Sequence, residues 1–237
     1  MNEDYSRTFT ITNNMLDCHD NLRISSLLDI TQETAGDHAN LLGVGYEEFK
    51  KRNYIWVVFR TKIKIIKNIK CLRSVKCLTS IVKPRLFEFP RDYEIYNNND
   101  LLAQIRSTWA IFDLNENKVC VPNDLTSLFT NNEGIFERVK KMPAFKKEEL
   151  IYKKDIIVTY SMLDHNGHMN NTRYVDLFLD IFEPSSKEII QELQVEYVSQ
   201  CYLNHQISLY IKEIENKKYL YGFEGDTLKF YLEAKYF

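Results

Sequence analysis

The amino-acid sequence predicts an α+β protein made of two similar halves, in each of which a long helix is wrapped by an antiparallel sheet. A helical apolar pattern at residues 22–35 is followed by several strand patterns. The same order returns after residue 169. A short polar turn at residues 97–100 favours antiparallel pairing of the strands on either side of it.

Composition limits the classes to which the chain can belong. With 237 residues and 44% hydrophobic content, it can bury one large core or two smaller fused cores. A net charge of −2 gives no indication of nucleic-acid binding. No apolar run approaches the roughly 18 residues that cross a bilayer, and no signal or transit peptide precedes the first predicted strand. We therefore expect a soluble, unprocessed protein that does not bind membranes.

The cysteines indicate a reducing environment. They are Cys18, Cys71, Cys77, Cys120 and Cys201. Their number is odd, and their spacing fits neither a disulfide framework nor a paired metal site. We expect a cytoplasmic protein.

The first half begins with a predicted strand at residues 5–11 and a turn at Asn13 and Asn14. The helix at 22–35 is expected to end within the glycine-containing stretch 36–43, and a short helix at 46–51 follows. The predicted strands of this half cover residues 55–66, 75–82, 91–96 and 101–112.

The strand pattern lapses between the two halves. We place an N-terminal domain at residues 1–125, a linker at 126–150 and a C-terminal domain at 151–237. The second half then shows a strand at 156–160 and an amphipathic helix ending near Phe182. Its later strands are predicted at residues 189–197, 206–214, 218–223 and 228–236.

An internal repeat relates the two halves. An offset of 147 aligns residues 15–30 with residues 162–177, with four identities in sixteen positions. It also places His19 opposite Asn166 and Asn21 opposite His168, so the amide and the imidazole are exchanged. We interpret the chain as a duplication in which the second copy keeps the catalytic arrangement, with a functional His19 as the lesser alternative.

Asp164, Asn166 and His168 lie between the strand at 156–160 and the following helix. Free N–H groups and the positive end of the dipole at a helix start suit an oxyanion. An imidazole, with an ordinary pKa of about 6.5, can accept a proton from water, and a carboxylate can hold its tautomer. The alternative is that Asp164 and Asn166 only cap the helix and His168 is a surface residue. His165 and His168 lack a third ligand nearby, so no metal is expected.

These residues form the string Asp164-x-Asn166-x-His168-x-Asn170-Asn171-x-x-Tyr174. The string resembles the active-site motif of the acyl-ACP thioesterases, hotdog-fold hydrolases of plant plastids and bacteria. Segments 29–45, 55–60 and 196–201 also resemble that family, as do Ser107, Thr108, Trp109, Asp113 and Pro122. The resemblance implies a tandem (double) hotdog, with the acyl pocket in the first hotdog and catalysis in the second.

The resemblance further implies hydrolysis of acyl-[acyl-carrier-protein] to free fatty acid and holo-ACP in fatty acid biosynthesis, without metal or organic cofactor. The partner would be acyl carrier protein, and the chain a monomer or homodimer. The catalytic residues implied are Asp164, Asn166, His168 and Gln200. Supporting roles are expected for Gly167, Asn170, Asn171, Tyr174, Glu196 and Cys201. The thioester carbonyl would be polarised by N–H groups near Gly167 and His168.

Gln200 departs from the pattern of the plant members, which carry a glutamate beside the cysteine. Glutamine can orient water but cannot accept its proton, so proton removal would fall on His168, aided by Asp164. If the strand stays extended, Glu196 points to the same face as Gln200 and substitutes for the missing carboxylate. Cys201 is either a nucleophile or, more often for such a cysteine, a packing residue.

Three other functions fit the same residues. They are an acyl-CoA thioesterase of the hotdog fold, a hotdog dehydratase, and a noncatalytic acyl-binding protein, for which Gln200 is the argument. An acidic carrier protein could be guided by a basic cluster near the linker. Its members are Arg138, Lys140, Lys141, Lys146, Lys147, Lys153 and Lys154. A rival patch comprises Lys62, Lys64, Lys67 and Lys70, of which the three even-numbered residues would share one strand face.

Overall fold

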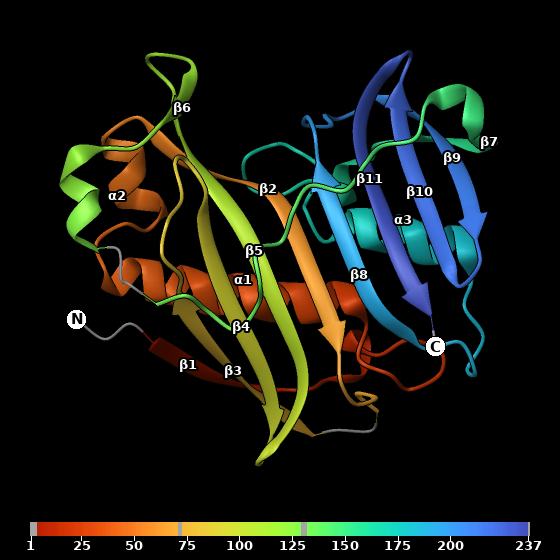
Figure 1. The fold of residues 1–237 in the computed structure, drawn as a ribbon, viewed down its shortest axis with the longest axis horizontal. Helices are drawn as coiled ribbons and strands as arrows, with labels where there is room; N and C mark the ends of the chain where they lie inside the picture. Colours follow the sequence, from red (N-terminus) through yellow and green to blue (C-terminus); the bar gives the residue numbers. More distant parts are fainter. Residues whose placement is uncertain (1–3, 71–72, 129–131, 237) are drawn as a thin grey trace. The chain divides into compact units, whose positions relative to one another are not determined.

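The computed structural model of the chain describes residues 4–70, 73–128 and 132–236, so Cys71 lies outside the described residues. The chain divides into two compact units, Met1–Val139 and Lys140–Phe237. Each unit is an antiparallel sheet with a helix against one face (Figure 1). The predicted α+β class is therefore confirmed in both halves.

The sheet of the first unit has the strand order β1-β3-β4-β5-β2, and all of its pairings are antiparallel. Its strands are β1 (Asp4–Thr10), β2 (Tyr54–Ile65), β3 (Ser74–Ile81), β4 (Phe89–Asn97), β5 (Asp100–Asp113) and the short β6 (Lys118–Cys120), which pairs with β5. Helix α1 (Ile24–Leu41) crosses one face of this sheet, and α2 (Tyr46–Lys51) follows it. Leu27 and Ile30 of α1 and Ile63 of β2 are fully buried in the core. Burial of such apolar side chains is the main stabilising contribution to the fold.

The sheet of the second unit has the order β8-β11-β10-β9-β7. Its strands are β7 (Ile151–Ile157), β8 (Ile190–Tyr197), β9 (Gln206–Ile214), β10 (Lys217–Glu224) and β11 (Thr227–Tyr236). Helix α3 (Arg173–Phe182) packs against it through Tyr174 and Phe178, which are buried. The ring of Tyr174 meets the ring of Phe230 on β11 edge to face, with centroids 4.6 Å apart. One helix and one curved sheet thus share a core in this unit as well.

Most predicted strands agree with the observed ones to within a few residues, but the strand expected at 156–160 shares only Ile156 and Ile157 with β7, and the short β6 was not predicted. The first long helix ends within the expected stretch 36–43, whereas the second begins later than expected. Helix α1 continues through Gly36 to Leu41, and Gly43, with a φ of 70°, is the left-handed residue just beyond its end. Helix α3 begins only at Arg173. The expectation that the helix starts near Gly167 and His168 is therefore wrong, and Asp164, Asn166 and His168 all lie in the loop before it.

Strand β2 ends at Ile65, so Lys67 and Lys70 lie outside it. Lys70 instead pairs with Asn21 in an isolated antiparallel bridge. The expectation that Lys62, Lys64 and Lys70 share one strand face is therefore wrong for Lys70.

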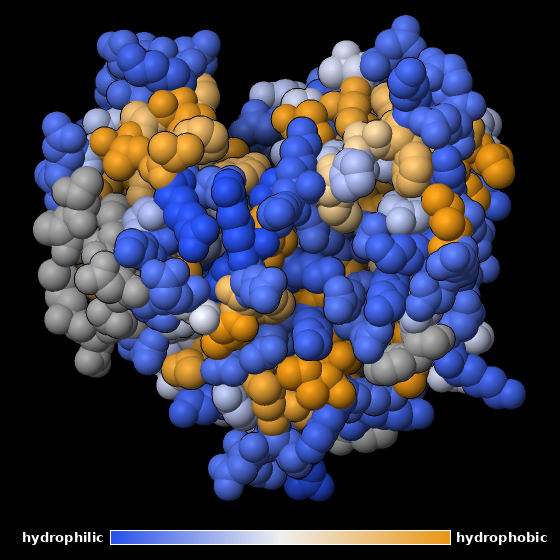
Figure 2. Space-filling view, in the orientation of Figure 1, coloured by the Kyte–Doolittle hydropathy of each residue, from blue (hydrophilic) through white to orange (hydrophobic). Residues whose placement is uncertain are grey.

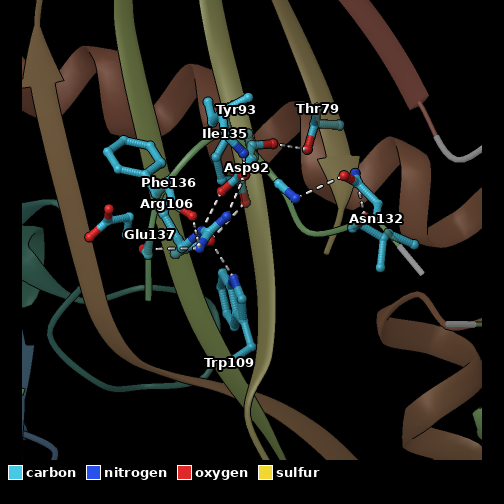
Figure 3. A network of polar contacts seen from close by, with 12 residues as sticks. Thr79, Asp92, Tyr93, Arg106, Trp109, Asn132, Ile135, Phe136 and Glu137 are labelled. Atoms are coloured by element: carbon cyan, nitrogen blue, oxygen red, sulfur yellow. Dashed lines mark hydrogen bonds and ion pairs between the residues drawn. The ribbon is translucent and has the colours of Figure 1, made fainter. Parts of the chain in front are cut away.

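A buried ion pair lies on the face of the first sheet opposite α1 (Figure 3). Arg106 of β5 donates from Nε and Nη2 to the carboxylate of Asp92 on β4, at 2.5 and 2.6 Å, and both side chains are at most 5% exposed. Asp92 also accepts the N–H of Ile135 at 2.7 Å, and Arg106 donates to the carbonyl of Phe136 at 3.1 Å. A Cβ at Gly134 would collide with both charged side chains. The linker segment is thus held on this face by buried charges rather than simply solvated.

A cleft of about 380 Å³ lies beside this ion pair in the first unit. Its rim is charged, but the charges are compensated: Lys83 and Arg85 lie 3.8 and 3.5 Å from Glu133, and Arg138 lies 3.6 Å from Glu88. On the face viewed in Figure 2, hydrophilic residues predominate and apolar patches lie between them. No helix in the described ranges is both long enough and apolar enough to cross a membrane.

Candidate active site

The loop at residues 160–170 is folded around the carboxylate of Asp164. Its Oδ1 accepts the N–H groups of Asn166 at 2.8 Å and His168 at 3.3 Å, and its carbonyl accepts the N–H of Gly167 at 3.1 Å. Gly167 has a φ of 78°, which is strained for residues with a Cβ. Asp164 therefore builds a tight turn, and the N–H groups of Gly167 and His168 are already occupied by it.

Asn170 forms a turn just before α3, whose N-cap residue Thr172 makes no side-chain capping hydrogen bond. Oδ1 of Asn170 accepts the N–H and the hydroxyl of Thr172, at 2.9 and 3.0 Å. Asn170 and Asp164 thus satisfy local backbone donors. A donor for the substrate carbonyl must then come from a group other than the N–H groups of Gly167 and His168.

His168 is held beside a second segment, residues 198–205. It forms an antiparallel bridge with Tyr202, and the N–H of Met169 donates to the carbonyl of Cys201 at 2.8 Å. The rings of His168 and Tyr202 meet edge to face, with centroids 4.9 Å apart. Within the described ranges, neither ring nitrogen of His168 has a hydrogen-bond partner, so the half-buried imidazole is available to water.

Gln200 lies on the same segment as Tyr202, the residue that packs against His168. The hydroxyl of Tyr202 donates to Oε1 of Gln200 at 2.7 Å. The structure therefore brings Asp164, Asn166, His168 and Gln200 together on two adjoining loops of the second unit, and Tyr202 contacts both loops.

Cys201 is fully buried beneath this site. Burial raises the pKa of its thiol, although a hydrogen bond with the Tyr174 hydroxyl opposes that shift. Burial likewise raises the pKa of Tyr174, whose ring also contacts that of Tyr197 at 5.3 Å. Asn171 accepts the Tyr197 hydroxyl through its carbonyl at 3.1 Å. A buried thiol with a raised pKa suits packing better than nucleophilic attack.

Glu196 makes hydrogen bonds with the linker segment and with its own strand. Its Oε1 accepts the N–H of Met142 at 3.1 Å and Nε2 of Gln194 at 2.8 Å, and the side chain is 3% exposed. Strand β8 ends at Tyr197, so the alternation that would align Glu196 with Gln200 stops before Gln200. The extended strand on which the expected shared face depended therefore does not reach Gln200, and Glu196 accepts a hydrogen bond from the linker segment.

The described part of the chain contains no cluster of potential metal ligands. No three His, Cys, Asp or Glu side chains gather there in a way that could hold an ion. His165 is exposed at the tip of the loop.

Two family models match the chain in the order of its two units. The acyl-ACP thioesterase N-terminal domain matches residues 2–129, and the acyl-ACP thioesterase C-terminal domain matches residues 145–227. The chain belongs to the acyl-ACP thioesterase family. All of the candidate site residues lie within the C-terminal match.

Relatives in plants share this sequence pattern at low identity. A chloroplastic palmitoyl-acyl carrier protein thioesterase of Cuphea hookeriana is 22% identical over 214 residues, and one of Gossypium hirsutum is 24% identical over 219. Each alignment covers 83% of this chain and 52% of the relative. The chain thus spans about half the length of these relatives.

Solved structures show the fold. An acyl-ACP thioesterase from Bacteroides thetaiotaomicron superposes with a TM-score of 0.90 at 20% identity, covering 100% of this chain and 98% of that one. The 12:0-ACP thioesterase from Umbellularia californica gives a TM-score of 0.87 at 18% identity, with the same coverage. The predicted double hotdog is confirmed.

Sequence reasoning missed Tyr202, His205, Glu224 and Lys229. Nδ1 of His205 lies 2.9 Å from Oε1 of Glu224, without hydrogen-bond alignment, and Nζ of Lys229 lies 3.1 Å from Oε2. The rings of His205 and Tyr202 are 5.2 Å apart. These residues come from three segments of the chain, so no local sequence pattern predicts that they lie together. The one available signal was the position of Tyr202 immediately after the predicted Gln200-Cys201 pair.

Proposed function

We propose that this chain hydrolyses acyl-[acyl-carrier-protein] thioesters, releasing free fatty acid and holo-ACP in fatty acid biosynthesis. The family membership supports this activity. The observation that carries it is the accessible imidazole of His168, placed by the Asp164 turn beside the Gln200 loop.

In the proposed mechanism His168 is the general base. It accepts a proton from a water molecule positioned by the Asn166 side chain, and the water oxygen attacks the thioester carbonyl carbon. The tetrahedral intermediate then loses its C–S bond, and the protonated imidazole returns the proton to the departing thiolate. Asp164 acts by fixing the turn that carries Asn166 and His168.

The decisive experiment measures thiol and fatty acid release from a panel of acyl-ACPs of C6 to C18, with the matching acyl-CoAs alongside. Turnover on acyl-ACP that falls at least about 100-fold in His168→Ala is expected, since general-base catalysis contributes that much or more. A preference for acyl-CoA over acyl-ACP would indicate that the chain is an acyl-CoA thioesterase. Tight acyl binding without turnover in the folded protein would contradict the proposed hydrolase activity and favour a noncatalytic acyl-binding function.

The carrier-protein surface is proposed at the exposed cations of the linker. Lys140, Lys141 and Lys146 are exposed, whereas Lys147 already lies 2.8 Å from Asp226. An acidic carrier would be attracted to such cations, and the attraction would weaken with salt. A triple Lys→Ala variant should raise KM for acyl-ACP but not for acyl-CoA, and an equal effect on both substrates would remove this surface from the proposal.

The proposed compartment is the cytoplasm. Cys18, Cys77, Cys120 and Cys201 are free thiols, as is usual for proteins of a reducing compartment. Fractionation of cells that produce the full-length protein would test this placement.

A further inference from the structure

The segment at residues 198–205 is hydrogen-bonded to β11 at one end and to the residue after β7 at the other. The N–H groups of Val198 and Ser199 donate to the carbonyl of Lys229, at 2.9 and 3.0 Å. At the other end, the N–H of Val158 donates to the carbonyl of His205 at 2.9 Å. Between these anchors the segment presents Gln200 and Tyr202 beside His168.

The first unit builds the same anchors from different side chains. There, the N–H groups of Ile66 and Lys67 donate to the carbonyl of Leu102, at 2.8 and 3.1 Å, and the N–H of Ile11 donates to the carbonyl of Arg73 at 2.9 Å. Leu102 thus stands where the second unit has Lys229, and Arg73 stands where it has His205. The backbone anchor at the Lys229 position therefore forms in the first unit with an uncharged leucine.

The second unit adds an ionic group to this common scaffold. Glu224 lies between Lys229 and His205, at 3.1 and 2.9 Å, and Lys229 is buried to 7% exposure. The ring of His205 contacts the ring of Tyr202, and the ring of Tyr202 packs edge to face against that of His168. Because Leu102 forms the same backbone anchor in the first unit, the charge of Lys229 is better explained by its ion pair with Glu224, which also adjoins His205 and through it Tyr202.

The hydroxyl of Tyr202 determines which end of the Gln200 amide is free to bond a substrate. It donates to Oε1 of Gln200 at 2.7 Å, so the carbonyl end of that amide is engaged. Nε2 of Gln200 has no acceptor within the described ranges, and the residue is half-buried. The group left for a substrate is therefore an N–H donor. At the same time, the N–H groups of Gly167 and His168 are bound to Asp164 and do not supply this donor.

We infer that Gln200 is the oxyanion donor of this site and that Tyr202 is the positioning residue that turns its N–H groups toward the thioester carbonyl. This inference rests on the proposed thioester hydrolysis. When water adds to the carbonyl carbon and His168 takes the proton, the negative charge on the carbonyl oxygen is met by Nε2–H of Gln200. The charge returns to the carbonyl as the C–S bond breaks. A glutamate in this position would repel that charge, so Gln200 provides a different chemical function rather than a lost one.

The test is a double-mutant cycle between Tyr202→Phe and Gln200→Ala, assayed on acyl-ACP. Tyr202→Phe keeps the ring against His168 and removes only the hydroxyl. Gln200→Ala should lower kcat about 100-fold, in the range for removal of one oxyanion donor. Tyr202→Phe should lower kcat about 10-fold with KM within about twofold, since the amide is still present but no longer fixed. The double variant should match Gln200→Ala alone.

Additive effects in this cycle, or full kcat in Tyr202→Phe, would overturn the inference. Tyr152→Phe on β7 is the matched control, because Tyr152 is 52% exposed and contacts Tyr210 rather than the site. It should leave kcat unchanged, so that a loss specific to Tyr202→Phe is attributable to the hydroxyl beside Gln200.

A readout that needs no turnover separates this inference from the proposed function. The side-chain amide signal of Gln200 in a ¹⁵N–¹H spectrum is identified by its loss in Gln200→Ala. It should shift in Tyr202→Phe and stay in place in Tyr152→Phe. An unmoved signal in Tyr202→Phe contradicts the positioning role even if the enzyme is active. A shifted signal in a protein that hydrolyses no thioester supports the orientation of the amide while the proposed function fails.

Discussion

The two loops that precede α1 and α3 have the same backbone and different side chains. At an offset of 147, the hydrogen bonds of one loop reappear in the other with nearly equal lengths. The N–H of Asp17 donates to the carbonyl of Asn21 at 2.8 Å, as the N–H of Asp164 does to that of His168. The N–H of Arg23 donates to the carbonyl of Met15 at 2.9 Å, as that of Asn170 does to Met162 at 2.8 Å.

Some side chains on this shared backbone form the turn in both loops, whereas others differ between the loops. In the first loop, Oδ1 of Asp17 accepts the N–H groups of His19 and Asn21, at 2.8 and 2.9 Å. In the second loop, Asp164 does the same for Asn166 and His168. The aspartate in both copies therefore belongs to the turn. Only the second copy has an imidazole at this position, where it meets the ring of Tyr202, whose hydroxyl bonds Gln200. This difference indicates that the catalytic character comes from exchanged side chains on an unchanged turn.

The largest expected effect comes from exchanging the amide and the imidazole within the second loop. The double variant Asn166→His with His168→Asn should lose about 100-fold or more of kcat on acyl-ACP, because the base moves away from the Gln200 loop. Steady-state kinetics measures the loss. The matched control, His19→Asn with Asn21→His in the first loop, should keep kcat within a few-fold. A large loss in the first loop as well would mean that His19 takes part in the reaction.

The next effect compares the two aspartates. Asp17→Ala should cost about 2 kcal/mol of unfolding free energy, because its carboxylate holds two well-aligned N–H groups. Asp164→Ala should cost about 1 kcal/mol, since one of its two bonds is 3.3 Å long. Chemical denaturation measures both values. In kinetics the order should reverse, with Asp164→Ala the less active variant, and equal activity of the two variants would contradict the division of roles between the loops.

A smaller effect is expected at the left-handed residue of each loop. Gly167 has a φ of 78° and Asp20 a φ of 62°. Gly167→Ala should cost about 1 kcal/mol in stability through backbone strain alone, because a Cβ there meets nothing within 4 Å. Gly167→Asp, which copies the first loop, should cost less, since aspartate tolerates this conformation better. A larger cost for Gly167→Asp in thermal unfolding would contradict that explanation.

The smallest effect is the pH dependence of stability that Glu224 should give to the second unit. A hydrogen bond from Lys229, with a further contribution from His205, lowers the pKa of Glu224. A lowered folded-state pKa means that stability is present above the unfolded value of about 4.3 and is lost as the pH falls through the folded value. The loss should be under about 1 kcal/mol because Glu224 is 38% exposed at its side chain. Melting temperatures measured from pH 6 to pH 3 should fall less steeply in Glu224→Gln, and identical slopes would exclude this contribution.

Local sequence patterns determined most of the fold. The β-branched and apolar runs from Tyr54 to Ile65 and from Asp100 to Asp113 became β2 and β5, and the asparagines at 97–99 formed the turn between β4 and β5. The repeat offset and the Asp164 to Tyr174 motif located the loop that carries His168. These features depend on residues close together in sequence, because backbone preference and side-chain alternation act over a few residues.

Tertiary structure alone decided which side chains meet. Glu196 was expected beside Gln200, but β8 ends at Tyr197 and Glu196 holds Met142 instead. Tyr202 reaches His168, and Glu224 reaches His205 and Lys229, because loop ends and strand register bring distant segments together. The ion pair of Asp92 and Arg106 arises from cross-strand pairing in the same way. Register and the ends of elements are set by the summed packing of the whole unit, so a local pattern determines a strand but not its neighbours.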